Sequence, residues 1–177
     1  MQSTTITDRP GPCITLAEAR AWLRLDHTAD DSLLSDIIIP GAQDKLEQAT
    51  GLCLSGDTLV VVEVSADSND GEIHLPFAPF DSVIDIELED MSIAADDYTI
   101  TGGSLYPVLN VSAGLKCKIE YLAGFTTGNG YNVAGIPPAL KVAVLMQTAY
   151  DYENRGDAKL SPGVNEIVLL HTRNLMI

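Results

Sequence analysis

The sequence is poor in basic residues. Its 177 residues include 10 Lys and Arg against 25 Asp and Glu, which gives a formal net charge of −15. Proteins that wrap nucleic acid need clustered Lys and Arg to neutralise the phosphates. The charge balance therefore argues against tight phosphate binding, but it is compatible with a surface that DNA passes without sticking.

Cysteine is scarce as well. The three cysteines, Cys13, Cys53 and Cys117, are odd in number and widely spaced, and they contain no CxxC pair. A disulfide framework needs paired cysteines, and a zinc site needs closely spaced ligands. We therefore expect three free thiols that pack as small hydrophobic side chains.

Long hydrophobic runs are also missing. The longest, Val142 to Met146, is far too short to cross a membrane. The N-terminal residues lack the basic and apolar regions of a signal peptide. We therefore expect no membrane association and folding in a cytoplasm.

The short motifs of common active sites are not found. The sequence has no GxxxxGK[ST] phosphate loop, no GxSxG and no HExxH, and its histidines (His27, His74 and His171) are scattered. Asn69 to Glu72 hints at a calcium loop, but Ala66 and Phe77 stand where oxygen ligands would be needed. A hairpin turn explains Asp70-Gly71 better. We predict no enzyme activity, no cofactor and no metal.

What the sequence does contain is a globular composition with a helical texture at both ends. Hydrophobic residues make up 46% and charged residues 20%, as in a folded domain. Thr15 to Glu18 forms a capping box, which predicts a helix to about Leu25. A second helix begins after Asp30 or Asp31 and stops at Gly51. Pro40-Gly41 lies inside it and predicts a kink or a break.

The middle of the chain has the alternation of β-strands. The strand-like segments between residues 57 and 125 are separated by turn residues and predict a small antiparallel sheet or barrel. They are Thr58–Val64, Ser82–Glu89, Tyr98–Thr101, Ser104–Leu109 and Lys116–Leu122.

Two more helices are predicted after this insert. Pro137-Pro138 begins a helix that runs to about Asn154 and is apolar almost all round, and Ser161-Pro162 begins another that runs to about Arg173. The predicted fold class is α+β: a small bundle of two N-terminal and two C-terminal helices with an inserted antiparallel sheet or small barrel. Residues 1–177 form one domain, with 14–52 and 136–177 as the helical unit and 57–125 as the acidic β insert.

The β insert contains most of the net charge. Residues 57–125 hold 13 acidic and two basic residues, so they account for −11 of the −15. Asp85, Glu87 and Glu89 alternate with apolar residues, so we expect them to share one face of a strand, opposite Ile84, Ile86 and Leu88. Such a face either keeps the protein soluble or lines a path from which an anion is repelled.

Four stretches together resemble one known family, the head–tail connector (adaptor or head-completion) proteins of siphophages and their prophages. The family usually has an unbroken helix where this chain has Pro40-Gly41. The stretches are Ile14–Asp26 followed by Asp30–Leu34, Leu46–Gly51, Ile119–Phe125 followed by Ile136–Lys141, and Tyr152–Gly156.

The resemblance implies a structural role without catalytic residues or cofactors. Such proteins form a homo-oligomeric ring of roughly twelve subunits beneath the portal protein. The ring extends the DNA channel, completes the head and provides the platform for a neck or tail-completion protein. The expected location is the virion neck, after assembly in the host cytoplasm, and DNA would pass through without specific binding.

Candidate assembly residues follow from the apolar and acidic patterns. For contacts with a neighbouring subunit or the portal we single out Leu140, Val144 and Tyr150, together with the apolar C-terminal residues Leu175, Met176 and Ile177. For the channel-facing surface we single out Asp85, Glu87 and Glu89.

Two other functional classes stay open. One is a small non-enzymatic binding module of a phage or bacterium that binds a ligand or receptor through its β domain. Trp22, the only tryptophan, is expected on the apolar face of its helix, which speaks against an exposed aromatic platform for sugars. The other is an enzyme, which would need polar side chains that converge in a deep pocket.

Overall fold

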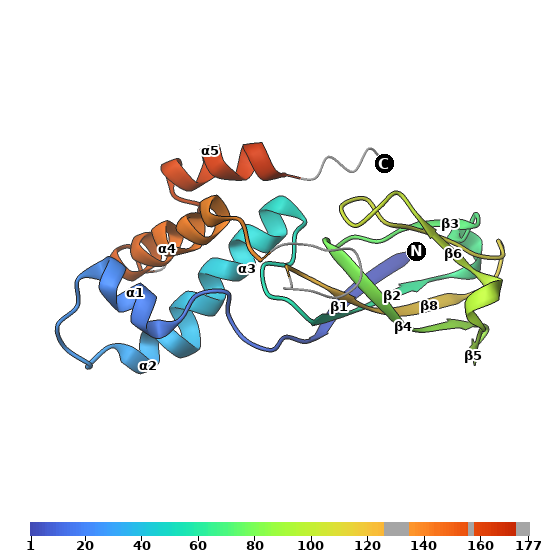
Figure 1. The fold of residues 1–177 in the computed structure, drawn as a ribbon, viewed down its shortest axis with the longest axis horizontal. Helices are drawn as coiled ribbons and strands as arrows, with labels where there is room; N and C mark the ends of the chain where they lie inside the picture. Colours follow the sequence, from blue (N-terminus) through green and yellow to red (C-terminus); the bar gives the residue numbers. More distant parts are fainter. Residues whose placement is uncertain (126–134, 156–157, 173–177) are drawn as a thin grey trace. The chain divides into compact units, whose positions relative to one another are not determined.

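The computed structural model describes residues 1–125, 135–155 and 158–172. The chain divides into two compact units. A β unit is formed by Met1–Pro10 and Ser55–Gly135, and a helical unit by Gly11–Leu54 and Ile136–Asn174. Figure 1 shows the elements of each unit along the chain.

The helical unit begins with helix α1 (Leu16–Leu23), whose capping box is present as predicted. The Thr15 hydroxyl accepts from the Glu18 N–H at 3.2 Å, and the Glu18 carboxylate accepts from the Thr15 N–H at 2.9 Å. Arg24 then adopts a left-handed conformation, with φ of 56°, and ends the helix. Trp22 is 46% exposed, so its expected position on a covered face was wrong.

The cap has a measurable energetic consequence. Replacing Thr15 by alanine removes the acceptor for the Glu18 N–H, so we expect a loss of about 1 kcal/mol in the free energy of unfolding. Thr28→Ala is the control, because Thr28 is exposed and lies before the next helix. Thermal or urea denaturation measures both, and equal stability of the two variants would contradict the prediction.

The second helix is continuous but irregular. It comprises α2 (Asp31–Leu33), a π-helical segment η1 (Leu34–Ile38) and α3 (Ile39–Thr50). Pro40 has no N–H to donate, and its ring would collide with the carbonyl of a regular preceding turn. In the wider π turn just before it, the Ile39 N–H donates to the Leu34 carbonyl. The expected irregularity is therefore a π turn, and the helix is not broken.

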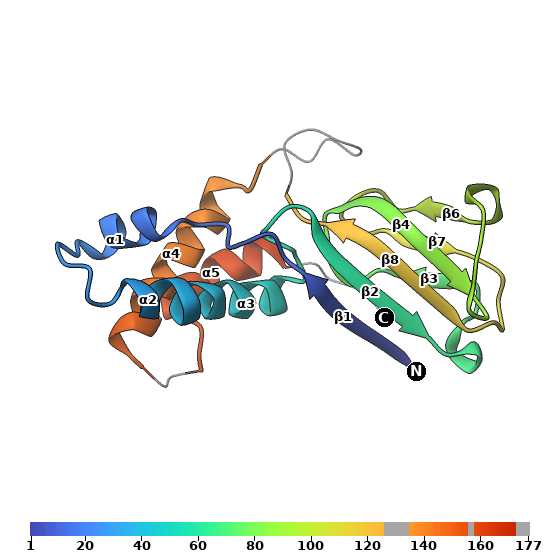
Figure 2. The ribbon, with the colours of Figure 1, turned by 90° about the horizontal axis from the view of Figure 1, so that it is seen from below.

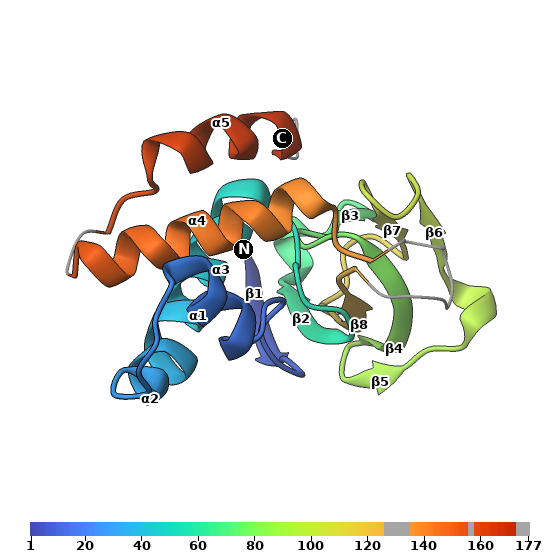
Figure 3. The same ribbon diagram turned by 60° about the vertical axis from the view of Figure 1, so that its left-hand side comes forward.

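Helices α4 (Pro138–Glu153) and α5 (Pro162–His171) complete the unit. α4 contacts α1, α3 and α5, which places it at the centre of the helical unit (Figure 3). Its sequence is apolar almost all round, but Val142 is 36% exposed while Leu140 and Val144 are buried. The core of the helical unit includes Ile14, Ala19, Leu34, Ile39, Leu46, Leu140, Val144 and Val164.

The β unit contains two open antiparallel sheets, and the described residues form no closed barrel. The five-stranded sheet has the order β1-β2-β8-β4-β5, and the three-stranded sheet has the order β3-β7-β6. Figure 2 shows β1, β2, β8 and β4 side by side in the larger sheet. Short 3₁₀ turns, η2 (Ala66–Ser68) and η3 (Ala95–Asp97), lie between strands. The strands are β1 (Gln2–Asp8), β2 (Thr58–Val64), β3 (Glu72–His74), β4 (Phe80–Leu88), β5 (Met91–Ser92), β6 (Thr99–Thr101), β7 (Val108–Asn110) and β8 (Cys117–Ala123).

Strands β2 and β8 alternate between buried and less buried positions, as their sequences predict. Each residue on one strand faces the matching residue on its neighbour, so Val62 lies beside Ile119 and both are fully buried. The core of the β unit draws on both sheets, and it includes Val60, Val62, Ile73, Leu75, Phe80, Leu109, Ile119 and Tyr121.

Asn69 to Glu72 does not form the predicted hairpin turn. The strands before and after it, β2 and β3, belong to different sheets, and β3 pairs with β7. Asn69 is almost fully buried, and its side-chain amide donates to the carbonyls of Ser112 and Leu115 at 3.0 and 2.9 Å. This segment is therefore a crossover between the sheets, held by a buried amide that must find partners.

The expected face of β4 was also partly wrong. Glu89 lies outside the strand, in the tight turn before β5, with a positive φ of 49°. The pairing of β4 with β8 shifts register between Val83 and Asp85, which leaves Ile84 as an extra residue that is 55% exposed. A β-bulge therefore interrupts the simple alternation.

Candidate functional site

The described residues offer little that suggests catalysis. Among them, no group of three or more His, Cys, Asp or Glu side chains is arranged to hold a metal ion. The three cysteines are free thiols. Burial raises the pKa of the Cys13 thiol to about 12, with nearby Glu47 adding to the effect, and burial raises that of Cys117 to about 11. Neither thiol is therefore activated as a nucleophile.

None of the helices within the described ranges is long and apolar enough to span a membrane.

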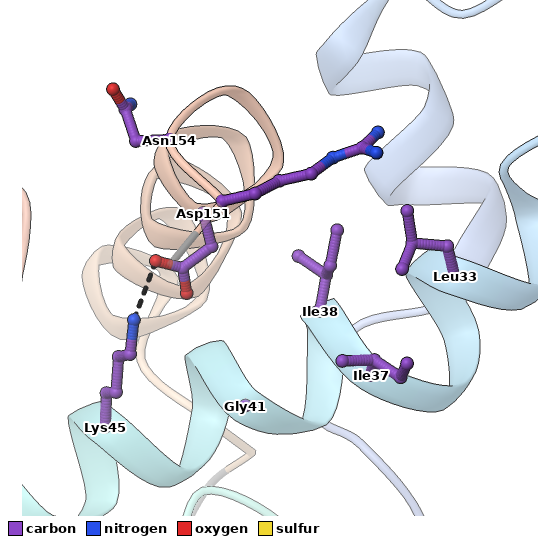
Figure 4. Close-up of a pocket in the computed structure, with 8 residues that line it drawn as sticks. Leu33, Ile37, Ile38, Gly41, Lys45, Asp151 and Asn154 are labelled. Carbon is purple, nitrogen blue, oxygen red and sulfur yellow. Dashed lines mark hydrogen bonds and ion pairs between the residues drawn. The ribbon is translucent and has the colours of Figure 1, made fainter. Parts of the chain in front are cut away.

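The helical unit has an apolar pocket of about 300 Å³ at the junction of η1 and α3 (Figure 4). Leu33, Ile37 and Ile38 supply its apolar lining, and Ile37 is 64% exposed. Gly41 adds no side chain, and a Cβ built there would meet nothing within 4 Å. The surface beside Gly41 is therefore concave. A larger side chain at this position would occupy part of the pocket.

Polar side chains at the C-terminal end of α4 and just beyond it line the other side of this pocket. Lys45 donates to Asp151 at 2.8 Å across the pocket wall, and Asn154 lies nearby (Figure 4). Arg155 lies over the ring of Tyr152, with 5.4 Å between the guanidinium carbon and the ring centre. The pocket therefore combines an apolar floor with a charged rim.

A second apolar surface of the helical unit lies on α5. Val164 and Val168 are buried against the unit, whereas Leu169 and Leu170 are 78% and 83% exposed. The sequence predicted the helix but not which of its apolar residues would be covered. That division depends on how α5 packs on α3 and α4.

In the β unit, the outward face of the large sheet carries mixed charge. Lys118 pairs with Glu120 at 2.8 Å and with Glu87 at 3.8 Å, and these carboxylates raise the pKa of Lys118. Asp85 accepts from the Ser92 hydroxyl at 3.0 Å. Asp85 and Glu87 thus lie together on this face, but a lysine partly neutralises it.

Glu89 lies apart from these two residues. Its carboxylate accepts from the Lys116 N–H at 2.6 Å, while its neighbour Asp90 pairs with the Lys116 side chain at 2.8 Å. These contacts hold the turn between β4 and β5, so the three predicted acidic residues do not share one strand face.

The predicted contact residues of α4 lie mainly inside their own chain. Leu140 and Val144 are at most 1% exposed, and Tyr150 is half-buried. Leu175, Met176 and Ile177 lie outside the described residues. Their docking on another subunit or on the portal stays a prediction.

The motifs that carry the family resemblance contact each other in the helical unit. Glu18 of the first stretch accepts from Lys141 at 2.5 Å, a contact that holds the pKa of the Glu18 carboxyl below its ordinary value. Tyr152 donates to Asp30 at 2.6 Å. These contacts pair residues that are more than 100 positions apart in the sequence. Some motif residues therefore serve to stabilise the helical unit.

Another motif residue, Glu47, is the centre of a buried polar network that the sequence analysis missed. Glu47 is 1% exposed, and its carboxylate accepts from the Leu54 N–H and from the Gln43 amide, both at 2.8 Å. Gln43 in turn accepts from the Cys13 N–H at 2.8 Å. Glu47 follows Gln43 by four residues, and this spacing places the two side chains side by side on a helix. The sequence could have predicted their contact from this spacing.

The whole chain is similar in structure to neck proteins of gene transfer agent (GTA) particles. A chain from the neck of the empty GTA particle, computed with C6 symmetry, matches with a TM-score of 0.75 and 23% identity. A chain from the virion of the native GTA particle gives 0.74, and one from the native neck, computed with C12 symmetry, gives 0.73, both at 23% identity. Each match covers 100% of this chain and 97% of the other. At this identity the likeness establishes the fold.

Among curated proteins, no sequence matches this chain.

The chain thus shares its α+β fold with proteins of the GTA particle. Residues 13–97 match the family described as phage gp6-like head-tail connector protein. This match confirms the resemblance drawn from the four sequence stretches. Because the family consists of structural connectors, the prediction of a non-enzymatic protein is confirmed as well.

Proposed function

We propose that this chain is a subunit of a homo-oligomeric ring in the neck of a phage-like virion, between the portal and the tail. The observation that carries the proposal is the match of the full chain to GTA neck proteins, together with the family of residues 13–97. The ring would extend the DNA channel, complete the head and provide the platform for the next neck or tail-completion protein.

The symmetry of the similar particles supports a closed ring. Their necks were computed with C6 and C12 symmetry, which is compatible with about twelve copies of one chain. A chain that contacts its neighbour head to tail closes into a ring when the rotation per subunit divides a full turn. One subunit type is then enough to build the whole layer.

Electron microscopy of the protein alone and mixed with portal protein tests this function. We expect a ring of subunits stacked on the portal, whether or not rings form without it. The matching genetic test removes the gene, and the expected result is filled heads that lack tails. Tailed, infectious particles formed without the protein, or an absence of rings on the portal, would overturn the proposal.

The acidic outward face of the β unit is proposed to lie along the DNA path or its approaches. Asp85 and Glu87 share this face, and Glu89 lies in the adjoining turn. In a ring each charge repeats once per subunit, so a weak repulsion becomes a continuous band. Salt screens such a band within roughly 8–10 Å, so it acts only on DNA that passes close by.

Replacing Asp85, Glu87 and Glu89 by lysine should make the assembled ring bind duplex DNA in a salt-dependent way and slow genome passage. The control carries the same charge change on exposed acidic residues of the helical unit, Asp26, Asp36 and Glu153. DNA binding to portal-bound rings is measured across a salt series. If the control ring binds DNA as tightly, position does not matter and the channel-facing assignment is wrong.

A further inference from the structure

The exposed face of α5 combines two large apolar side chains with a carboxylate. Leu169 and Leu170 follow Glu166 by three and four residues, so all three lie on one side of the helix. All three are exposed, and Glu166 forms no ion pair with a described residue. In water this face costs free energy unless a partner covers it.

The pocket at the junction of η1 and α3 has the complementary properties. Its floor is apolar, and Arg155 at its rim is exposed and forms no ion pair with a carboxylate among residues 1–125, 135–155 and 158–172. A cavity of roughly 150 Å³ holds a molecule of benzene. The pocket volume of about 300 Å³ is therefore large enough for one or two leucine side chains.

The pocket and the α5 face lie on the same helical unit, yet they do not cover each other. The residues that line the pocket come from η1, α2, α3 and the C-terminal end of α4, and none comes from α5. Val164 and Val168 are buried and hold α5 on its own helical unit. The face with Leu169 and Leu170 points away from that unit and is free to contact another molecule. A convex and a concave surface on one chain are what a head-to-tail contact between copies requires.

We propose that in the ring α5 of one subunit docks on the next subunit, with Leu169 and Leu170 in the pocket formed by Leu33, Ile37 and Ile38. Glu166 then lies against Arg155 of that neighbour, which adds charge complementarity to the apolar contact. This inference rests on the proposed ring. Each subunit uses one α5 and one pocket, so the contact repeats around the ring.

Cysteine crosslinking tests the contact in assembled rings. The variant Ile37→Cys/Leu170→Cys replaces two exposed side chains, so its melting temperature should match that of the wild type. After assembly on the portal and mild oxidation, we expect a ladder of covalent multimers up to the full ring on a non-reducing gel. The controls are the two single variants and Leu170→Cys combined with Met91→Cys on the exposed β5, and these should give no ladder.

Charge exchange tests the orientation of the same contact. Arg155→Glu or Glu166→Arg, each added to the crosslinking pair, should lower the initial rate of ladder formation about tenfold, and the two together should restore it. A contact without this ion pair would show no restoration. That result would overturn the proposed geometry even if a ladder forms.

The outcomes separate this contact from the proposed function. If portal-bound rings are visible but the double-cysteine protein forms no ladder, the contact is wrong and the connector function stands. The same result is expected if α5 docks on the portal or on the β unit of its own chain. If no ring forms on the portal even with the wild-type protein, the proposed function itself fails.

Discussion

Replacing Val144 by aspartate should unfold the protein or leave it in inclusion bodies. Val144 is fully buried on α4, the helix that contacts α1, α3 and α5. An unpaired carboxylate in this position costs several kcal/mol, a large part of the roughly 5–15 kcal/mol that stabilises a typical domain. Urea or thermal denaturation measures the loss, and ring assembly on the portal should be lost with it.

Val142 provides the matched control for this substitution. It lies two residues before Val144 on the same helix, but it is 36% exposed. Val142→Asp introduces the same side chain with access to water, so we expect a change below about 1 kcal/mol. A soluble Val144→Asp protein with the wild-type melting temperature would show that α4 is not the centre of the helical unit.

Replacing Glu47 by leucine should lower the free energy of unfolding by about 2–5 kcal/mol. Leucine is similar in size but accepts no hydrogen bonds, so the Leu54 N–H and the Gln43 amide each lose a buried acceptor. Each unsatisfied buried donor costs about 1–3 kcal/mol. Burial alone would favour the apolar leucine over the charged glutamate. We expect the lost hydrogen bonds to outweigh that gain.

Glutamine at position 47 separates the two contributions. Glu47→Gln keeps a carbonyl oxygen that can still accept from Leu54 or Gln43, so its loss should be smaller than that of Glu47→Leu. Denaturation midpoints of the two variants and the wild type make the comparison. A leucine variant that is as stable as the wild type would mean that the network contributes nothing to the fold.

Where the sequence predicted the structure well, the signal was local. The capping box at Thr15 needs only contacts three residues apart, and β2 (Thr58–Val64) is rich in β-branched residues. α4 begins at Pro138 and ends at Glu153, one residue before the expected end. In each case the backbone preference and the hydrophobic pattern indicate the same element.

Where the sequence misled, the decisive contacts were distant. β1 is exposed and polar, and it is a strand because it pairs with β2, more than 50 residues away. The bulge at Ile84 follows from the register of β4 against β8. Asn69 was expected in a hairpin turn, but its amide has its partners on a distant loop.

The candidate surfaces divide in the same way. Leu140 and Val144 have the composition of a contact surface, but packing against α1 and α3 buries them within their own chain. Leu169 and Leu170 look no different in sequence from Val164 and Val168, yet only the first pair is exposed. The pocket beside Ile37 combines residues of two helices, so no single stretch of sequence predicts it.

The sequence by itself determined the α+β class, the succession of two helices, a β insert and two helices, the acidic charge of the insert and the resemblance to the connector family. These depend on composition, short-range periodicity and motif order, all of which are properties of neighbouring residues. Only the tertiary structure decided which apolar faces are covered, which carboxylates share a surface and where the pocket lies. Those outcomes depend on pairing between distant segments, because burial is a property of the packed unit and not of the residue.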